Sequence, residues 1–184
     1  MSPDKLLDDL AESATCARAH YQVWWALANR IYPDLEDRAN DYADFFRASF
    51  DAHYTAMFIN VGHLFDRRKD SSSVKTLLDL LVNDLTEDEH ASFTTRFEAL
   101  AALATPIVTA RHKTVAHIDA LLTEKEVFEP LEITWNEVRD LIDDTCRLVR
   151  DLVRKRGLSH AIFESQRYLD ATLDVVRSLP PKSA

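Results

Sequence analysis

The chain has 184 residues, of which 46% are hydrophobic and 29% are charged, a composition typical of one globular domain. Its formal net charge of -9 argues against loose binding of nucleic acid over the whole surface, so any RNA contact must be local. The longest apolar stretches are shorter than the about 20 residues that cross a bilayer, which excludes a membrane-spanning helix. The N-terminus lacks the features of a secretory signal, so we expect a cytoplasmic protein. Cys16 and Cys146 lack metal-binding spacing and should be packed thiols.

Helices should dominate the fold. Only two glycines occur, Gly62 and Gly157, and the Asn-Gly, Asp-Gly and Gly-Gly turns of β-hairpins are absent. Apolar residues instead recur at intervals of three and four, which places them on one face of a helix. The first helix should run from about residue 6 to 31 and end before Pro33. The second should run from about residue 34 to 67. Its aromatic-rich stripe, expected in the core, consists of Phe46, Phe50, His53, Met57, Val61 and Leu64.

Capping signals mark the starts of the third and fourth helices. The serines of residues 69–73 can cap a third helix, and the residues of its buried face should be Val74, Leu77, Leu78 and Leu81. Thr86 and Glu89 have the spacing of a capping box at the start of the fourth helix. If that helix continued to Ile118 it would be unusually long, so we expect Pro106 to kink or split it.

The last two helices complete one domain. Thr134 and Glu137 predict a second capping box, and Gly157 should end the fifth helix. A sixth helix should span about residues 159–179, followed by a short disordered tail at 180–184. The sequence therefore predicts a single all-α domain over residues 1–184, a bundle of about five to six helices with its core in about residues 5–179.

Several kinds of site can be excluded or reduced to structural roles. The chain lacks GxxxxGK[ST], GxGxxG, GxSxG and HExxH motifs. A carboxylate-bridged metal centre needs two Glu-x-x-His pairs, and only Glu87 with His90 has that spacing, at the acidic start of a helix where capping and solvation explain it. His63 and Asp66 could ligate a metal or share a hydrogen bond, and the hydrogen bond is favoured. We therefore expect no metal and no other cofactor.

An Arg followed by a His after four to six residues is a loose pattern that composition alone produces by chance. The sequence contains three matches with five intervening residues, namely Arg47 to His53, Arg111 to His117 and Arg154 to His160. In the first match, His53 lies on the apolar stripe expected in the core. The last match contains Gly157, which should end the helix, between its Arg and its His. The middle match lies in a basic island, residues 105–118, that contains no acidic residue. Cations at a helix C-terminus can simply compensate the helix dipole, but that accounts for the arginine and lysine there and not for two histidines.

The run RHKTVAHID, from Arg111 to Asp119, resembles the active-site motif of HEPN-type ribonucleases in the form of the abortive-infection AbiU-like branch. The likeness includes the preceding segment HLFDRRKDSSSVKTLLDLL and covers roughly residues 20–155. His112 stands where Asn or Asp is commoner in the family. The resemblance implies a HEPN-like helical bundle, an RNA substrate, and a homodimer whose two motifs line a shared cleft.

The motif assigns roles as follows. Arg111 and His117 would be catalytic, while His112 and Lys113 would bind the substrate. Residues six apart in a helix are rotated by about 120° and separated by about 9 Å, so one helix cannot direct both side chains at one atom, and a second copy would complete the site. The resemblance therefore implies a metal-independent endoribonuclease of the toxin or phage-defence type.

The competing hypothesis is a non-catalytic HEPN-fold module that binds RNA, a nucleotide or a partner protein through the same cleft. Under either hypothesis, an antitoxin or the product of a neighbouring gene is a candidate partner. The acidic segments 34–44 and 84–89 could recruit a basic partner, or could be solvated faces. The cationic stretch 147–156 could extend an RNA surface, or could compensate the dipole of its own helix.

Overall fold

A computed structural model of the chain describes residues 2–31, 34–68, 70–111, 133–159 and 166–180. Every regular element in this part of the chain is a helix, which confirms the all-α class. The helices, in chain order, are α1 (Pro3–Asn29), α2 (Glu36–Asp41), α3 (Ala43–Leu64), α4 (Val74–Leu80), α5 (Glu87–Arg111), α7 (Trp135–Lys155) and α8 (Arg167–Ser178). The described residues thus form seven helices, slightly more than the about five to six predicted, because the predicted second helix is divided at Tyr42 into α2 and α3.

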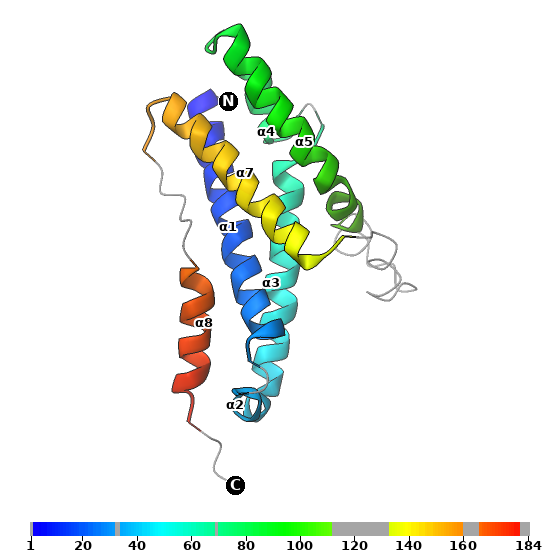
Figure 1. The fold of residues 1–184 in the computed structure, drawn as a ribbon, viewed down its shortest axis with the longest axis vertical. Coiled ribbons are helices and arrows are strands. Elements are labelled where there is room, and N and C mark those ends of the chain that lie inside the picture. Colours follow the sequence, from blue (N-terminus) through cyan, green and yellow to red (C-terminus); the bar gives the residue numbers. More distant parts are fainter. Residues whose placement is uncertain (1, 32–33, 69, 112–132, 160–165, 181–184) are drawn as a thin grey trace.

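The long helices α1 and α3 run antiparallel and form the centre of the bundle (Figure 1). Helix α7 crosses α1, and α5 packs against α3, α4 and α7. Helix α8 lies along α1, at the opposite end of the molecule from α4. Each of these helices except α2, which has no buried residue, therefore buries apolar side chains against at least one neighbour, as the three-and-four spacing predicted. None of the described helices combines the length and apolarity that crossing a membrane requires.

The core lies where α1, α3, α5 and α7 meet. The most deeply buried large side chains of this region include Leu6, Leu10, Phe58, Leu64, Phe97, Ile107 and Leu141. The stripe predicted for α3 is only partly right, because Met57, Val61 and Leu64 are buried whereas Phe46, Phe50 and His53 are half-buried. The difference follows from the packing, since α5 reaches only the C-terminal end of α3, where Phe65 and Phe97 stack at 5.8 Å.

The predicted helix boundaries depend on local capping contacts, and these are present. Ser73 Oγ accepts the N–H of Thr76 at 3.4 Å and begins α4. Thr134 and Glu137 form a reciprocal capping box at the start of α7. Helix α7 ends where Gly157 adopts a φ of 66°, a left-handed conformation that costs a glycine little. Each side-chain cap of this kind contributes about 1 kcal/mol to helix stability.

Helix α2 holds the C-terminal end of α8. The guanidinium of Arg38 donates to the carbonyl oxygen of Arg177, and the Tyr42 hydroxyl donates to that of Pro180 at 2.9 Å. Both cysteines are free thiols, as expected. Burial raises the pKa of the Cys146 thiol to about 11, so this side chain is an inert part of the core.

Candidate functional site

Helix α5 carries the start of the predicted motif at its C-terminal end. It begins at the predicted capping box, in which Thr86 Oγ1 accepts the N–H of Glu89 at 3.3 Å and the Glu89 carboxylate accepts the N–H of Thr86 at 3.1 Å. The helix is described to Arg111. The side chain of Arg111, together with residues His112, Lys113 and His117, lies outside the described part of the chain. The backbone of α5 thus fixes where the predicted site begins.

We expected Pro106 to kink or split this helix; Pro106 lies inside α5 and the helix continues on both sides of it, so there is no split. Proline has no N–H and leaves the carbonyl four residues earlier without its helical donor. Two threonine hydroxyls nearby donate to carbonyls one turn back, Thr105 to Ala101 at 2.9 Å and Thr109 to Thr105 at 2.8 Å. Hydroxyl bonds of this type tend to bend a helix. The last turns of α5 before Arg111 therefore lack one backbone hydrogen bond and contain two threonine hydroxyl bonds to the backbone.

A pocket of about 450 Å³ opens between the end of α3 and this part of α5. Phe65, Ala101 and Val108 give it an apolar wall, and the two threonines of α5 add hydroxyl groups. Val108 lies three residues before Arg111, which places the backbone of Arg111 about 5 Å further along the helix axis. The pocket therefore runs along α5 to within one turn of the motif.

Two guanidinium groups, those of Arg67 and Arg68, also line this pocket. Arg67 pairs with Glu98 of α5 at 2.8 Å, and Arg68 pairs with Asp66 at 2.9 Å. The hydrogen bond that the Arg68 guanidinium donates to the Asp66 carboxylate raises the pKa of Arg68 above its ordinary value, so its charge is permanent. The two arginine side chains are 61% and 72% exposed, and solvent-exposed pairs of this kind exchange partners at little cost. Both cations are thus available to an incoming anion.

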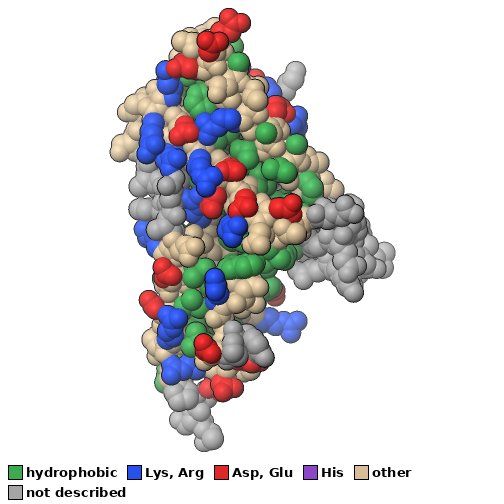
Figure 2. Space-filling view, in the orientation of Figure 1, with side chains coloured by type: hydrophobic (Ala, Val, Ile, Leu, Met, Phe, Trp, Pro, Cys, Tyr) green, Lys and Arg blue, Asp and Glu red, His purple; other side chains and the backbone are tan. Residues whose placement is uncertain are grey.

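The surface of α5 differs from that of α7. Over α7, basic and acidic side chains alternate, whereas hydrophobic side chains gather over α5 (Figure 2). Between Glu98 and Arg111 the sequence of α5 contains no acidic residue. An approaching polyanion would therefore meet less repulsion along the last turns of α5 than on the rest of this acidic protein.

The family model of AbiU2, a HEPN family, matches residues 4–170. The chain belongs to this family. No curated protein and no solved structure matches it. The AbiU2 match confirms the predicted resemblance and is wider than the residues 20–155 that we expected it to cover. It spans both the segment 65–68 and the motif 111–117.

The other Arg-to-His matches in this AbiU2 chain have different surroundings. His53 Nδ1 lies 2.8 Å from His20 Nδ1, and burial lowers the pKa of both imidazoles, so the pair joins α3 to α1 in neutral form. Arg47 is exposed on α3. The match that begins at Arg154 is interrupted by Gly157 at the end of α7. Both matches therefore have structural explanations.

The candidate metal ligands make other contacts. His63 Nδ1 lies 3.2 Å from Ser13 Oγ, and the Asp66 carboxylate binds the neighbouring arginine. His90 Nε2 lies 3.1 Å from the carbonyl oxygen of Leu78. Within the ranges that the structure describes, no three His, Cys, Asp or Glu side chains are grouped so that they could hold a metal ion.

The cationic stretch at the end of α7 is occupied by contacts within the fold. Arg156 bridges Asp4 at 2.9 Å and Asp84 at 2.7 Å, and Lys155 pairs with Glu89. These contacts join α7 to the first turn of α1 and to the start of α5. They favour a structural role for this stretch over an RNA-binding one.

The sequence did not identify Arg67 and Arg68 as residues that line this pocket. They were part of the segment that carried the family likeness, but nothing in the sequence placed that segment beside α5. The available signal was two adjacent arginines directly after a Phe-Asp pair at a helix end.

Proposed function

We propose that the chain is a metal-independent endoribonuclease of the toxin or phage-defence type, with an active site completed by a second copy of the chain. The observation that carries the proposal is the pocket beside α5, which extends to within one turn of Arg111 and is lined by Arg67 and Arg68. Membership of the AbiU2 family supports it. In this proposal the pocket receives the RNA strand next to the bond that is cut.

Arg111 would hold the scissile phosphate by charge-assisted hydrogen bonds and stabilise the charge that develops on its oxygens. His117 would move the protons, because an imidazole that titrates near neutral pH can take a proton from the ribose 2′-hydroxyl or give one to the departing 5′-oxygen. The 2′-oxygen forms a bond to phosphorus while the bond from phosphorus to the 5′-oxygen breaks. The products are a 2′,3′-cyclic phosphate and a free 5′-hydroxyl, and the reaction requires no metal ion.

The remaining cations would guide the strand. His112 and Lys113 would contact phosphates beside the scissile bond, and Arg67 and Arg68 would contact phosphates further along the pocket. In this position the two pocket arginines exchange their carboxylate partners for phosphate oxygens. Affinity then depends on a few local contacts, which suits a protein with a net charge of -9.

The test is a ribonuclease assay with chelator present, on wild type, Arg111→Ala and His117→Ala. Arg47→Ala is a matched control, because Arg47 begins a motif match of the same spacing and is exposed on α3. Loss of the proton-transferring group should slow cleavage by about 10²- to 10⁴-fold, and the control should cleave at the wild-type rate. Cleavage that requires added metal, or that persists in a folded His117→Ala variant, would contradict the proposal. Binding of RNA without any cleavage would identify the chain as the non-catalytic module instead.

A further inference from the structure

A second hollow, of about 160 Å³, lies on another side of the molecule, between α1, α7 and the start of α8. Three arginines from different places in the fold line it: Arg18 inside α1, Arg30 at the C-terminal end of α1, and Arg139 in the first turns of α7. One carboxylate, Asp143, also lines it. Three cations and one anion leave an excess of two positive charges in the wall of this hollow, in a chain whose overall charge is -9.

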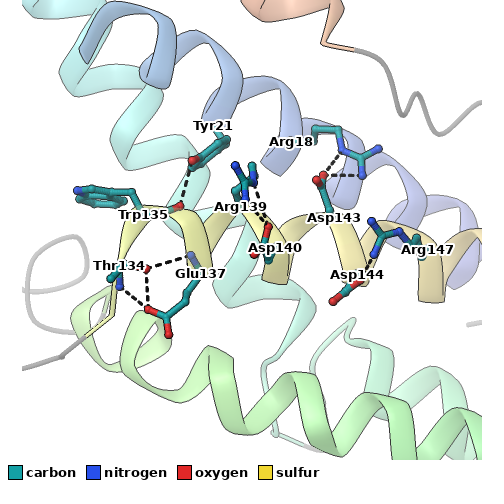
Figure 3. A network of polar contacts seen from close by, with 10 residues as sticks. All are labelled: Arg18, Tyr21, Thr134, Trp135, Glu137, Arg139, Asp140, Asp143, Asp144 and Arg147. Carbon is teal, nitrogen blue, oxygen red and sulfur yellow. Dashed lines mark hydrogen bonds and ion pairs between the residues drawn. The ribbon is translucent and has the colours of Figure 1, made fainter. Parts of the chain in front are cut away.

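Arg18 is fixed in place by Asp143. The side chain of Arg18 is only 5% exposed, and its Nε and Nη2 lie 2.9 Å and 2.7 Å from the same carboxylate oxygen (Figure 3). A buried guanidinium requires a partner of this kind, because an uncompensated charge in the interior is strongly destabilising. Arg18 and Asp143 therefore neutralise each other in the wall of the hollow. The excess positive charge comes from the other two arginines, Arg30 and Arg139.

Arg30 and Arg139 lie nearer the solvent. Arg30 is exposed and forms no ion pair within the part of the chain that the structure describes. Arg139 pairs with its neighbour Asp140 at 2.8 Å, with both side chains about half exposed, so this contact exchanges readily. Both guanidiniums can therefore turn to an anion in the hollow without breaking a buried contact.

The N-terminus of α8, which is the positive end of its helix dipole, also lies at this hollow. Gln166, the N-cap residue, makes no capping hydrogen bond with its own side chain, and it lines the hollow. The N–H of Tyr168 donates instead to Gln22 Oε1 of α1, at 3.2 Å. The dipole of a helix makes its N-terminus attractive to anions even where an N–H group, like that of Tyr168, is already bonded. Here it faces the same space as the three arginines.

The size of the hollow limits what can occupy it. Pockets for drug-sized molecules measure about 300 to 1,000 Å³, so 160 Å³ accommodates one compact group and not a whole nucleotide. The planar guanidinium matches the oxygens of a phosphate or a carboxylate. Cations that converge from several sides, with a helix N-terminus among them, suit a tetrahedral oxyanion better than a planar one.

We propose that the hollow between α1, α7 and α8 binds a phosphate group, held by Arg30, Arg139 and the first turn of α8. The phosphate can come from inorganic phosphate or from the terminal phosphate of a nucleic acid. The site is separate from the α5 pocket and does not depend on RNA cleavage.

The test is calorimetric titration of the full chain with inorganic phosphate at low ionic strength, for wild type, Arg30→Ala and Arg139→Ala. Arg147→Ala is the matched control, because Arg147 is also an exposed arginine of α7, pairs with Asp144, and lies outside the hollow. Removal of one charge-assisted contact should weaken binding by about tenfold for each pocket arginine, and the control should leave the affinity unchanged. Arg18 is not varied, since its loss would leave a carboxylate without its partner.

A second arm distinguishes the two sources of phosphate. The probe is a short DNA strand, which lacks the 2′-hydroxyl and is not cut, with and without a 5′-phosphate. Tighter binding of the phosphorylated strand, lost in Arg30→Ala, identifies a terminal phosphate as the occupant. Equal binding of both strands, with phosphate still bound, identifies the free ion. Absence of phosphate binding at millimolar concentration, or equal affinity in wild type and both pocket variants, would overturn the proposal.

Discussion

Substitution of Glu98 by Gln should tighten RNA binding, because it frees a cation beside the α5 pocket. Glu98 is the carboxylate that holds the Arg67 guanidinium at 2.8 Å beside the α5 pocket. Glutamine keeps the shape of the side chain and loses the charge, so the arginine is released to contact a phosphate. An exposed ion pair is worth up to about 1 kcal/mol, which sets an upper limit of about fivefold on the gain in affinity.

The salt dependence of RNA affinity gives a second, independent measure of how many phosphates the pocket arginines contact. Each phosphate of a single strand that a cation neutralises contributes about -0.7 to the slope of log affinity against log salt. If Arg67 and Arg68 make one phosphate contact each, raising salt fourfold should weaken wild-type binding about sevenfold more than it weakens binding by the Arg67→Ala, Arg68→Ala double variant.

The assay is fluorescence anisotropy with a labelled 2′-O-methyl oligoribonucleotide, which has no free 2′-hydroxyl and is not cleaved. Asp174→Asn serves as a control for net charge, because Asp174 is an exposed carboxylate paired with Arg177 on α8, far from the pocket in sequence and on another helix. Glu98→Gln should bind more tightly than this control. Equal affinities of the two variants, together with a wild-type salt slope in the double arginine variant, would refute the pocket as the path of the RNA.

Three further outcomes are expected. An equimolar mixture of Arg111→Ala and His117→Ala chains should regain up to about a quarter of wild-type cleavage if each site takes its arginine from one chain and its histidine from the other, because about half of the dimers are then mixed and each mixed dimer has one complete site of two. No recovery would place both residues in one chain. Burial lowers the pKa of His20 and His53 from 6.5, so the unfolded chain takes up protons first. The free energy of unfolding should therefore decrease as the pH falls below about 6.5, and thermal unfolding measured as a function of pH will test this. A His20→Gln, His53→Gln double variant should show a smaller decrease over the same pH range than wild type. Thr134→Ala should lower the free energy of unfolding by about 1 kcal/mol in denaturant titration, and Thr134→Ser should not.

The parts of the fold that were predictable from the sequence are those that depend on neighbouring residues. The capping box of Thr134 with Glu137, the cap at Ser73 and the end of α7 at Gly157 each involve contacts within a few positions. The division of the second helix at Tyr42 was not predictable in this way, since the hydroxyl of Tyr42 binds a carbonyl 138 residues away. Helix boundaries set by neighbouring residues can be predicted from the sequence, whereas a helix break that accompanies contacts with distant residues gives no pattern in the local sequence.

The same distinction applies to the sites. The motif that begins at Arg111 could be found because its unusual charge is continuous in sequence. The arginines beside α5, Arg67 and Arg68, could not be assigned to it, because only the packing of α3 on α5 brings them together. Arg18 and Asp143 are 125 residues apart and belong to helices whose contact no spacing predicts. Clusters assembled from distant helices become visible only in three dimensions.

The aromatic cluster at the start of α7 gives the chain a built-in optical probe. All three tryptophans belong to it, with the Trp24 ring 4.4 Å from that of Trp135 and 6.1 Å from that of Trp25. The Tyr21 hydroxyl anchors the cluster by donating to the Trp135 carbonyl at 3.0 Å. Rings this close couple their electronic transitions, so the tryptophan emission and the tryptophan bands of the near-ultraviolet circular dichroism report on one place, where α7 begins. Unlabelled protein can therefore signal an event at that junction separately from the helical content of the bundle.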